Sequence, residues 1–214
     1  MLSYLDGSHH PLRTIYCIGR NYAAHIEELG NARPDAPVVF LKPQSALTSA
    51  AAIHLPDFSH DVHYEAELVL HIGHGGKNIA REQALAHIAG YALGLDLTAR
   101  DLQTSAKNAG LPWTLAKGFD HAAILTPFIP AQQLAPENIR FTMDLNGERR
   151  QNGDTRLMLY PIADLIVYLS RHFTLHAGDI IYTGTPEGVG KLKSGDRIRL
   201  ALENGALTAE YHIV

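Results

Sequence analysis

The sequence has little of what places a protein in a membrane, an oxidising compartment or a nucleic-acid complex. Its 214 residues contain one cysteine, Cys17, so neither an intrachain disulfide nor a paired-cysteine metal or redox site can form. No apolar run approaches the roughly 18 residues of a membrane span, and residues 1–12 lack the apolar segment of a secretory signal. The 18 basic and 22 acidic residues are interspersed, which argues against nucleic-acid and anionic-membrane partners. We therefore expect a cytoplasmic protein.

Several common catalytic motifs are also missing from the sequence. Gly190-Lys191 lacks both the upstream glycine and the following Ser or Thr of a phosphate-binding loop. The glycine-rich segment 71–77 does not have the spacing of a dinucleotide-binding turn. The chain has no GxSxG nucleophile turn and no HExxH zinc helix. These absences disfavour nucleotide binding and serine hydrolysis.

What is present is a series of short β-like runs with a few helices. Apolar or alternating patterns predict strands over residues 14–18, 38–41, 64–72, 88–97 and 141–145, with further short strands near the C-terminus. Helices are predicted over residues 21–29 with Asn21 as cap, 100–109 ending at Gly110, and 161–173. Asn146-Gly147 and Asn204-Gly205 suit hairpin turns. Because strands and helices do not alternate, we expect a β-rich α+β fold in one domain over residues 1–214.

A first candidate site is the segment His63-Tyr-Glu65-Ala-Glu67. On a strand, alternate residues share a face, so these three side chains project the same way. Two neighbouring carboxylates repel each other, and a hard divalent ion such as Mg²⁺, Mn²⁺ or Ca²⁺ removes that repulsion. The alternative is a solvated strand face, where Glu pairs are common.

Asp96 strengthens the metal interpretation, because it ends an apolar strand just before a helix. Three carboxylates leave about three positions of an octahedral ion to water and substrate, which suits a 2-oxo acid or a 1,3-dicarbonyl compound. The alternative roles for Asp96 are a helix cap or an ion pair with Arg100.

Two further side chains have the chemistry of an active site. His25 and Glu28 are three residues apart on a predicted helix, so the carboxylate can orient the imidazole as a general base. Lys117 interrupts an apolar run and can stabilise an enolate. The alternatives are an exposed His–Glu pair and a lysine that extends its amine to water. The loop of residues 182–190 can receive a carboxylate or simply form a turn.

An ordered set of segments resembles the fumarylacetoacetate hydrolase family, in particular its small acylpyruvate hydrolases. The resemblance extends from about Tyr16 to Val214 and is carried by the segments GRNYAAH, FLKP, HYEAEL, LDLTARDLQ, GLPWTLAKGFD, LNGE, AGDIIYTGTPEGVG and SGD. It implies a mixed β-roll with a few short helices, and a homodimer. It also implies Mg²⁺ or Mn²⁺ at Glu65, Glu67 and Asp96. In the family's pattern, a water-activating pair falls on His25 and Glu28, enolate stabilisation on Lys117, and substrate binding on Arg20, Arg100, Gln103 and Thr185.

The activity that this resemblance implies is hydrolysis of a C–C bond in acylpyruvates such as fumarylpyruvate or acetylpyruvate. The products are pyruvate and a carboxylic acid, formed through a metal-bound pyruvate enolate. Decarboxylation of oxaloacetate passes through the same enolate, so oxaloacetate decarboxylase, or a decarboxylase or isomerase of aromatic catabolism, is the alternative. A third possibility is a binding protein that holds metal and oxalate without turnover.

Overall fold

Strands make up most of the molecule in the computed structural model, which describes residues 1–202 and 205–214. The largest sheet has eight strands. Seven of them follow one another across the sheet, and β12 pairs with β9 beside them. In spatial order they are β4 (Val38–Lys42), β3 (Ile15–Gly19), β15 (Ile180–Tyr182), β8 (Ala66–Ile72), β9 (Ile88–Asp96), β11 (Ala123–Leu125) and β5 (Leu47–Thr48), with β12 (Ile129–Pro130) alongside.

Three smaller sheets complete the strand framework. A five-stranded sheet has the order β14 (Glu148–Asp154), β13 (Arg140–Leu145), β17 (Arg197–Leu202), β18 (Thr208–Ile213) and β6 (Ala52–Ile53). A three-stranded sheet contains β10 (Thr98–Ala99), β7 (Val62–Tyr64) and β16 (Gly190–Lys191). A hairpin at the N-terminus joins β1 (Leu2–Ser3) to β2 (His9–His10).

The predicted hairpin turn between β13 and β14 is confirmed, because Asn146 and Gly147 have φ of 54° and 83°. Positive φ at both central residues is what a tight turn between twisted strands requires. Gly205 also has a positive φ of 71°, whereas its predicted turn partner Asn204 lies outside the described residues.

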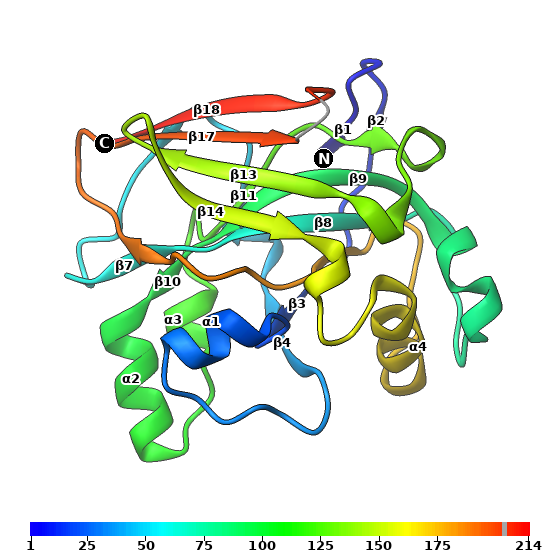
Figure 1. The fold of residues 1–214 in the computed structure, drawn as a ribbon, viewed down its shortest axis with the longest axis horizontal. Coiled ribbons are helices and arrows are strands. Elements are labelled where there is room, and N and C mark those ends of the chain that lie inside the picture. Colours follow the sequence, from blue (N-terminus) through cyan, green and yellow to red (C-terminus); the bar gives the residue numbers. More distant parts are fainter. Residues whose placement is uncertain (203–204) are drawn as a thin grey trace.

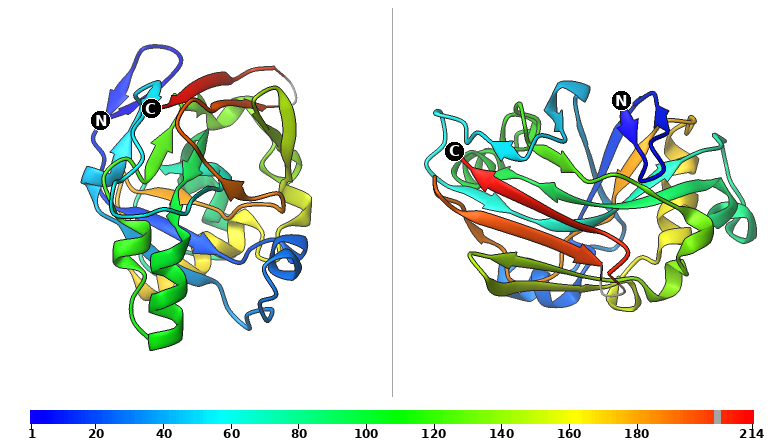
Figure 2. Two further views of the ribbon diagram at one scale, coloured as in Figure 1. Left: turned by 90° about the vertical axis from the view of Figure 1, so that its left-hand side faces the viewer. Right: turned by 90° about the horizontal axis from the view of Figure 1, so that it is seen from above.

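The main hydrophobic core lies between the five-stranded sheet and the long sheet. Figure 1 shows the strands of the five-stranded sheet lying across β8 and β9. Even-numbered residues of β8 point into this core, whereas Val69 belongs to a smaller cluster on the opposite face. Strands therefore form the body of the molecule and helices its margin, as the two views of Figure 2 show. The expectation of a β-rich α+β fold is confirmed.

In the part of the chain that the structure describes, four α-helices and five short 3₁₀ segments accompany the sheets. Gly110, with φ of 66°, ends α2 as predicted, and α4 buries an apolar face that contains Ile162, Leu165, Ile166 and Leu169. Among the described residues, no helix combines the length and apolar character needed to cross a membrane. The segments are α1 (Ala23–Glu28), α2 (Arg100–Ala109), α3 (Thr114–Lys117), α4 (Ile162–His172), η1 (Gln44–Ala46), η2 (Arg81–His87), η3 (Ala131–Gln133), η4 (Pro136–Asn138) and η5 (Thr155–Leu157).

The prediction that Asn21 caps the first helix is wrong. Tyr22 precedes α1, and no side chain caps this helix. The buried Asn21 amide donates to the carbonyls of Tyr160 and Thr183 at 3.2 and 2.8 Å and accepts from the Tyr160 amide at 2.8 Å. These bonds tie three segments together and satisfy backbone groups in the interior, which outweighs a local cap on a six-residue helix.

A candidate metal and active site

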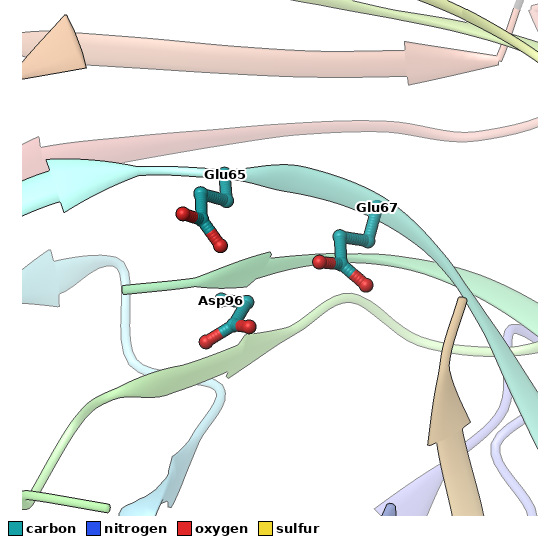
Figure 3. Close-up of side chains that lie close together, drawn as sticks. All are labelled: Glu65, Glu67 and Asp96. Atoms are coloured by element: carbon teal, nitrogen blue, oxygen red, sulfur yellow. The ribbon is translucent and has the colours of Figure 1, made fainter. Parts of the chain in front are cut away.

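Three carboxylates meet where β8 and β9 lie side by side. Each of Glu65, Glu67 and Asp96 offers an oxygen within 4.8 Å of the others, and all three side chains point toward one another in Figure 3. The register explains this arrangement, because Glu67 lies opposite Gly94 and Asp96 follows two residues later on the same face. All three residues are buried, so the expected alternative of a solvated strand face is excluded for them.

The predicted single strand over residues 64–72 divides at Glu65. Val62–Tyr64 forms β7 in the three-stranded sheet, and β8 begins at Ala66 in the long sheet. His63 therefore does not join the carboxylates, contrary to the expected common face, and its Nε2 lies 3.0 Å from Asp61 Oδ1. Glu65 lies at the junction of the two sheets, where its side chain can reach groups from both.

Lys117 is a buried cation within this cluster and not a lysine that extends to water. Its Nζ donates to Glu65 Oε2 at 2.7 Å and to Asp96 Oδ2 at 2.8 Å. Burial alone would lower the pKa of this amine, but Asp96 and Glu65 raise it above its ordinary value. Conversely, burial would raise the pKa of Glu65, and Lys117 and Arg100 hold it well below the usual range. These groups therefore stay charged.

Lys42 is a second buried lysine of the site, and it was not among the residues predicted from the sequence. Its Nζ lies 2.7 Å from Asp96 Oδ1 and donates to the backbone carbonyls of Lys117 and Leu97. It thereby fixes both Asp96 and the end of α3. The sequence feature that could have indicated Lys42 is the FLKP segment. A lysine at the end of an apolar edge strand, however, looks like an ordinary exposed charge.

Glu67 is the one carboxylate of the three for which the described residues provide no salt bridge. Its Oε2 accepts a hydrogen bond of 2.6 Å from the Gly184 amide. Burial raises the pKa of Glu67 well above its usual range, and the nearby charges of Asp96 and Glu65 add to the effect. A bound cation would remove this cost, so the carboxylate set fits a hard divalent ion.

The loop after β15 runs back along β8, and its Gly184 amide is hydrogen-bonded to the Glu67 carboxylate of that strand. Thr183 and Thr185 donate through their hydroxyls to the carbonyls of Leu68 and Ala66, at 2.8 and 2.9 Å. Gly184 has a φ of 102°, and a Cβ added to it would lie 2.7 Å from the Asn21 Cβ, so the position requires glycine. We expected that this loop can receive a carboxylate, and the carboxylate that it binds in the structure is the side chain of Glu67. The Thr185 hydroxyl, predicted to bind substrate, is hydrogen-bonded to protein groups.

A pocket of about 200 Å³ adjoins the cluster. Arg100 lines this pocket and donates to Glu65 Oε1 and to Gln103 Oε1, both at 2.6 Å. The alternative of an Asp96–Arg100 ion pair is not found among the described residues, where Asp96 pairs with Lys42 and Lys117. Larger hollows exist, such as one of about 610 Å³ over β13 and β14, but they contain none of the three carboxylates. The pocket is lined by Arg20, His25, Leu29, Asn31, Phe40, Glu65, Arg100, Gln103, Thr104, Lys107, Trp113 and Lys117.

The predicted His25–Glu28 pair is present at the edge of this pocket. His25 is buried on α1, and its Nδ1 lies 3.4 Å from Glu28 Oε2. The Glu28 carboxylate also accepts from the Gly188 amide at 3.0 and 3.2 Å, which holds it against the loop after β15. With Nδ1 directed at the carboxylate, Nε2 is the ring nitrogen left for a proton from water.

Comparison with known proteins places this chain among proteins that share both fold and length. The profile of the family described as Fumarylacetoacetate (FAA) hydrolase C-terminal matches residues 14–211. The oxaloacetate tautomerase YcgM of Escherichia coli (strain K12) is 43% identical over 202 residues, covering 93% of this chain and 92% of that protein. The mitochondrial oxaloacetate tautomerase FAHD1 of Arabidopsis thaliana is 46% identical over 186 residues, which cover 86% of this chain and 83% of that protein.

Among solved structures, the fumarylpyruvate hydrolase of Pseudomonas aeruginosa in complex with Mn²⁺ and pyruvate superposes with a TM-score of 0.94. It is 39% identical, and the match covers 100% of this chain and 94% of that chain. A family profile over nearly the whole length, relatives above 40% identity and a shared fold agree with the resemblance of the sequence motifs. The chain belongs to the fumarylacetoacetate hydrolase family.

Proposed function

We propose that this protein is a divalent-metal-dependent hydrolase that cleaves the C–C bond of acylpyruvates, such as fumarylpyruvate or acetylpyruvate. The observation that carries the proposal is the position of His25. Its ring, with Glu28 on the Nδ1 side, lines the same pocket as Glu65, Arg100 and Lys117. A general base, a cation site and positive charge for a developing enolate are the groups that this reaction needs.

Glu65, Glu67 and Asp96 are the residues that would hold Mg²⁺ or Mn²⁺, because three carboxylates form a hard oxygen donor set. Such an ion would supply Lewis acidity toward the carboxylate and 2-oxo oxygens of the substrate. The Mn²⁺ in the related Pseudomonas aeruginosa structure supports this choice, and the carboxylate set accommodates either ion.

The side chains of the pocket would then act on water and on the substrate. His25, oriented by Glu28, takes a proton from water, and the hydroxide adds to the C4 carbonyl. The C3–C4 bond breaks, its electron pair remains on C3 as pyruvate enolate, and a proton to C3 completes pyruvate. We assign stabilisation of the developing charge to Lys117, and binding of the 2-oxo acid to Arg100 and Gln103. Substrate contacts of Arg20 and Thr185 stay predictions.

Oxaloacetate is the second candidate substrate, and the names of the curated relatives favour it. Both relatives described above are oxaloacetate tautomerases. Keto–enol conversion of oxaloacetate needs the same stabilisation of an enolate, and so does its decarboxylation. Neither of these reactions needs an attacking water, but keto–enol conversion still moves a proton from C3 and can use a base. His25 as a base toward water therefore separates hydrolysis from decarboxylation.

The test compares wild type with His25→Ala after metal removal and reconstitution with Mg²⁺ or Mn²⁺. We expect metal-dependent release of pyruvate from acylpyruvates, and a loss of about 10²-fold or more in His25→Ala, the usual contribution of a general base. Decarboxylation of oxaloacetate by the variant should fall much less. An equal fall of hydrolysis and decarboxylation would refute His25 as the water-activating base, and turnover of oxaloacetate alone would favour the second candidate.

Three expectations about the whole protein are part of the same proposal. They are a single domain over residues 1–214, a homodimer and a cytoplasmic location. Light scattering on the purified protein measures the mass, and a value near twice the 23.4 kDa of one chain supports the dimer.

A further inference from the structure

Two cations at the edge of the pocket converge on one neutral oxygen. Arg20 donates to the Asn31 side-chain carbonyl at 3.2 Å, and Lys107 donates to the same atom at 3.0 Å. No carboxylate forms a salt bridge with Arg20 or Lys107 anywhere in the described part of the chain. Basic side chains near one another in a pocket normally share an anion, because their mutual repulsion otherwise opposes the arrangement.

The charge balance of the pocket points in the same direction. Its lining has four cationic side chains, those of Arg20, Arg100, Lys107 and Lys117, but a single carboxylate, that of Glu65. Lys107 has a pKa below its ordinary value because of partial burial and because of the charges of Arg20 and Arg100. Arg100 and Lys117 pair with Glu65 and Asp96, so the charges that lack a carboxylate partner among the described residues are those of Arg20 and Lys107.

Helix α2 places the Lys107 charge at a defined distance from Arg100, which lies beside the carboxylate cluster. Arg100, Gln103 and Lys107 all line the pocket, and their spacing of three and four residues puts them on one face. Seven residues of helix correspond to a rise of roughly 10 Å from Arg100 to Lys107. The rings of Phe40 and Trp113, with centroids 6.0 Å apart, give the same pocket an apolar wall. The pocket thus combines two polar ends with a surface suited to a carbon chain.

The backbone fixes Arg20 in an unusual conformation. Its φ is 59°, a value that residues other than glycine seldom adopt. The next residue, Asn21, is buried and bound to Tyr160 and Thr183, and a Cβ added to Gly184 would lie 2.7 Å from its Cβ. The fold therefore holds Arg20 at the pocket despite the local cost, which is typical of residues that contact a ligand.

We propose that Lys107, together with Arg20, binds a carboxylate at the far end of the acyl group. The preferred substrates are then 2-oxo acids with a second carboxylate separated from the first by a short carbon chain. This inference rests on the proposed function and makes it narrower, because it ranks fumarylpyruvate, which ends in a carboxylate, above acetylpyruvate, which ends in a methyl group. Lys107 acts here as a specificity-determining residue.

A binding experiment tests the site without turnover. Calorimetry on the Mn²⁺-loaded protein compares 2-oxoadipate with 2-oxohexanoate, which has the same chain length but no second carboxylate. We expect the wild type to bind 2-oxoadipate about tenfold more tightly, the usual contribution of a charge-assisted contact. Lys107→Met should remove the preference and Lys107→Arg should keep it. Lys193→Met, at an exposed lysine that does not line the pocket, is the matched control and should leave it unchanged.

Kinetics then separate this inference from the proposed function. With fumarylpyruvate, Lys107→Met should lower kcat/KM about tenfold, mainly through KM, and with acetylpyruvate it should change kcat/KM by less than twofold. Equal binding of the two oxo acids by the wild type, or an equal effect of the variant on both acylpyruvates, would overturn the carboxylate site. If neither acylpyruvate is cleaved, the proposed hydrolase fails, whereas the binding preference still decides the role of Lys107.

Discussion

One face of β8 buries polar side chains at both ends, but in opposite ways. At one end, Glu67 lies beside Glu65 and Asp96, and Lys117 and Arg100 hold the pKa of Glu65 below its usual range. At the other end, His71 Nδ1 forms a hydrogen bond of 2.6 Å with the Tyr4 hydroxyl, and the His71 ring packs against the ring of Phe128. Burial lowers the pKa of His71 to about 4, so this ring is neutral at neutral pH. A strand can thus carry a charged site at one end and a neutral structural contact at the other, and the two differ in whether opposite charges lie beside the buried group.

The largest effect is expected within the charged end, from replacing Glu65 or Glu67 in metal-free protein. Glu65→Gln removes the carboxylate partner of Arg100 and one of the two carboxylate partners of the buried Lys117, which should cost about 3–5 kcal/mol of unfolding free energy. Glu67→Gln removes a buried acid with a raised pKa and retains an acceptor for the Gly184 amide. Its stability at pH 7 should be equal to that of the wild type or higher. Urea unfolding measures both, and equal destabilisation would contradict the different roles assigned to the two residues.

The neutral end predicts a loss of stability in acid. The pKa of His71 is about 4 in the folded protein and 6.5 in the unfolded chain, so the unfolded chain binds more protons between these values. The contribution of His71 is therefore complete above pH 6.5 and falls by up to about 3 kcal/mol as the pH drops toward 4. Unfolding of wild type and His71→Phe at several pH values isolates this effect, because the variant lacks the titrating ring. Parallel curves for the two proteins would exclude it.

A smaller effect follows from removing the partner of His71. Tyr4→Phe leaves the buried Nδ1 of His71 without its hydrogen bond, which should cost about 1–2 kcal/mol at pH 7. Because the Tyr4 hydroxyl binds His71 and none of the three carboxylates, the affinity for Mn²⁺ should not change. Chemical unfolding and a metal titration of the same variant test both statements, and a weakened metal site would show that the two ends of β8 are coupled.

The smallest effect concerns His10, whose exposed ring lies 5.3 Å from that of His71. After burial, the charge of His10 is the second cause that lowers the pKa of His71. His10→Ala should therefore move the pKa of His71 slightly upward, because one source of repulsion is gone. An NMR titration of the His71 ring measures the shift, and a downward shift would contradict this interpretation.

The sequence could predict the parts of the site that depend on strand periodicity. Strand alternation predicted that Glu65 and Glu67 share a face, which is a local rule. The turn at Asn146-Gly147 and the end of α2 at Gly110 were predictable for the same reason, since each depends on the φ of a single residue. That Asp96 joins Glu65 and Glu67 depends on the register between β8 and β9, and it was the family resemblance that implied the complete set.

The rest depends on contacts between distant segments. Asn21 looked like a helix cap, but it binds Tyr160 and Thr183, about 140 and 160 positions later in the chain. His63 left the carboxylate face because the strand divides at Glu65, which no pattern in residues 64–72 indicates. Lys42 was missed because its partner Asp96 is 54 positions away, although a search of the α2 face for residues seven apart would have found Lys107.

The central claim is that Glu65, Glu67 and Asp96 form a divalent-metal site. Glu67→Gln tests it most directly, because this substitution changes a ligand without leaving a buried cation unpaired, and Glu210→Gln at an exposed strand position is the matched control. Titration with Mn²⁺, followed by electron paramagnetic resonance, should show one ion bound per chain in wild type and control. In Glu67→Gln, with the fold verified by circular dichroism, the affinity should fall by about 10²-fold or more. Unchanged binding of Mn²⁺ by folded Glu67→Gln would contradict the account.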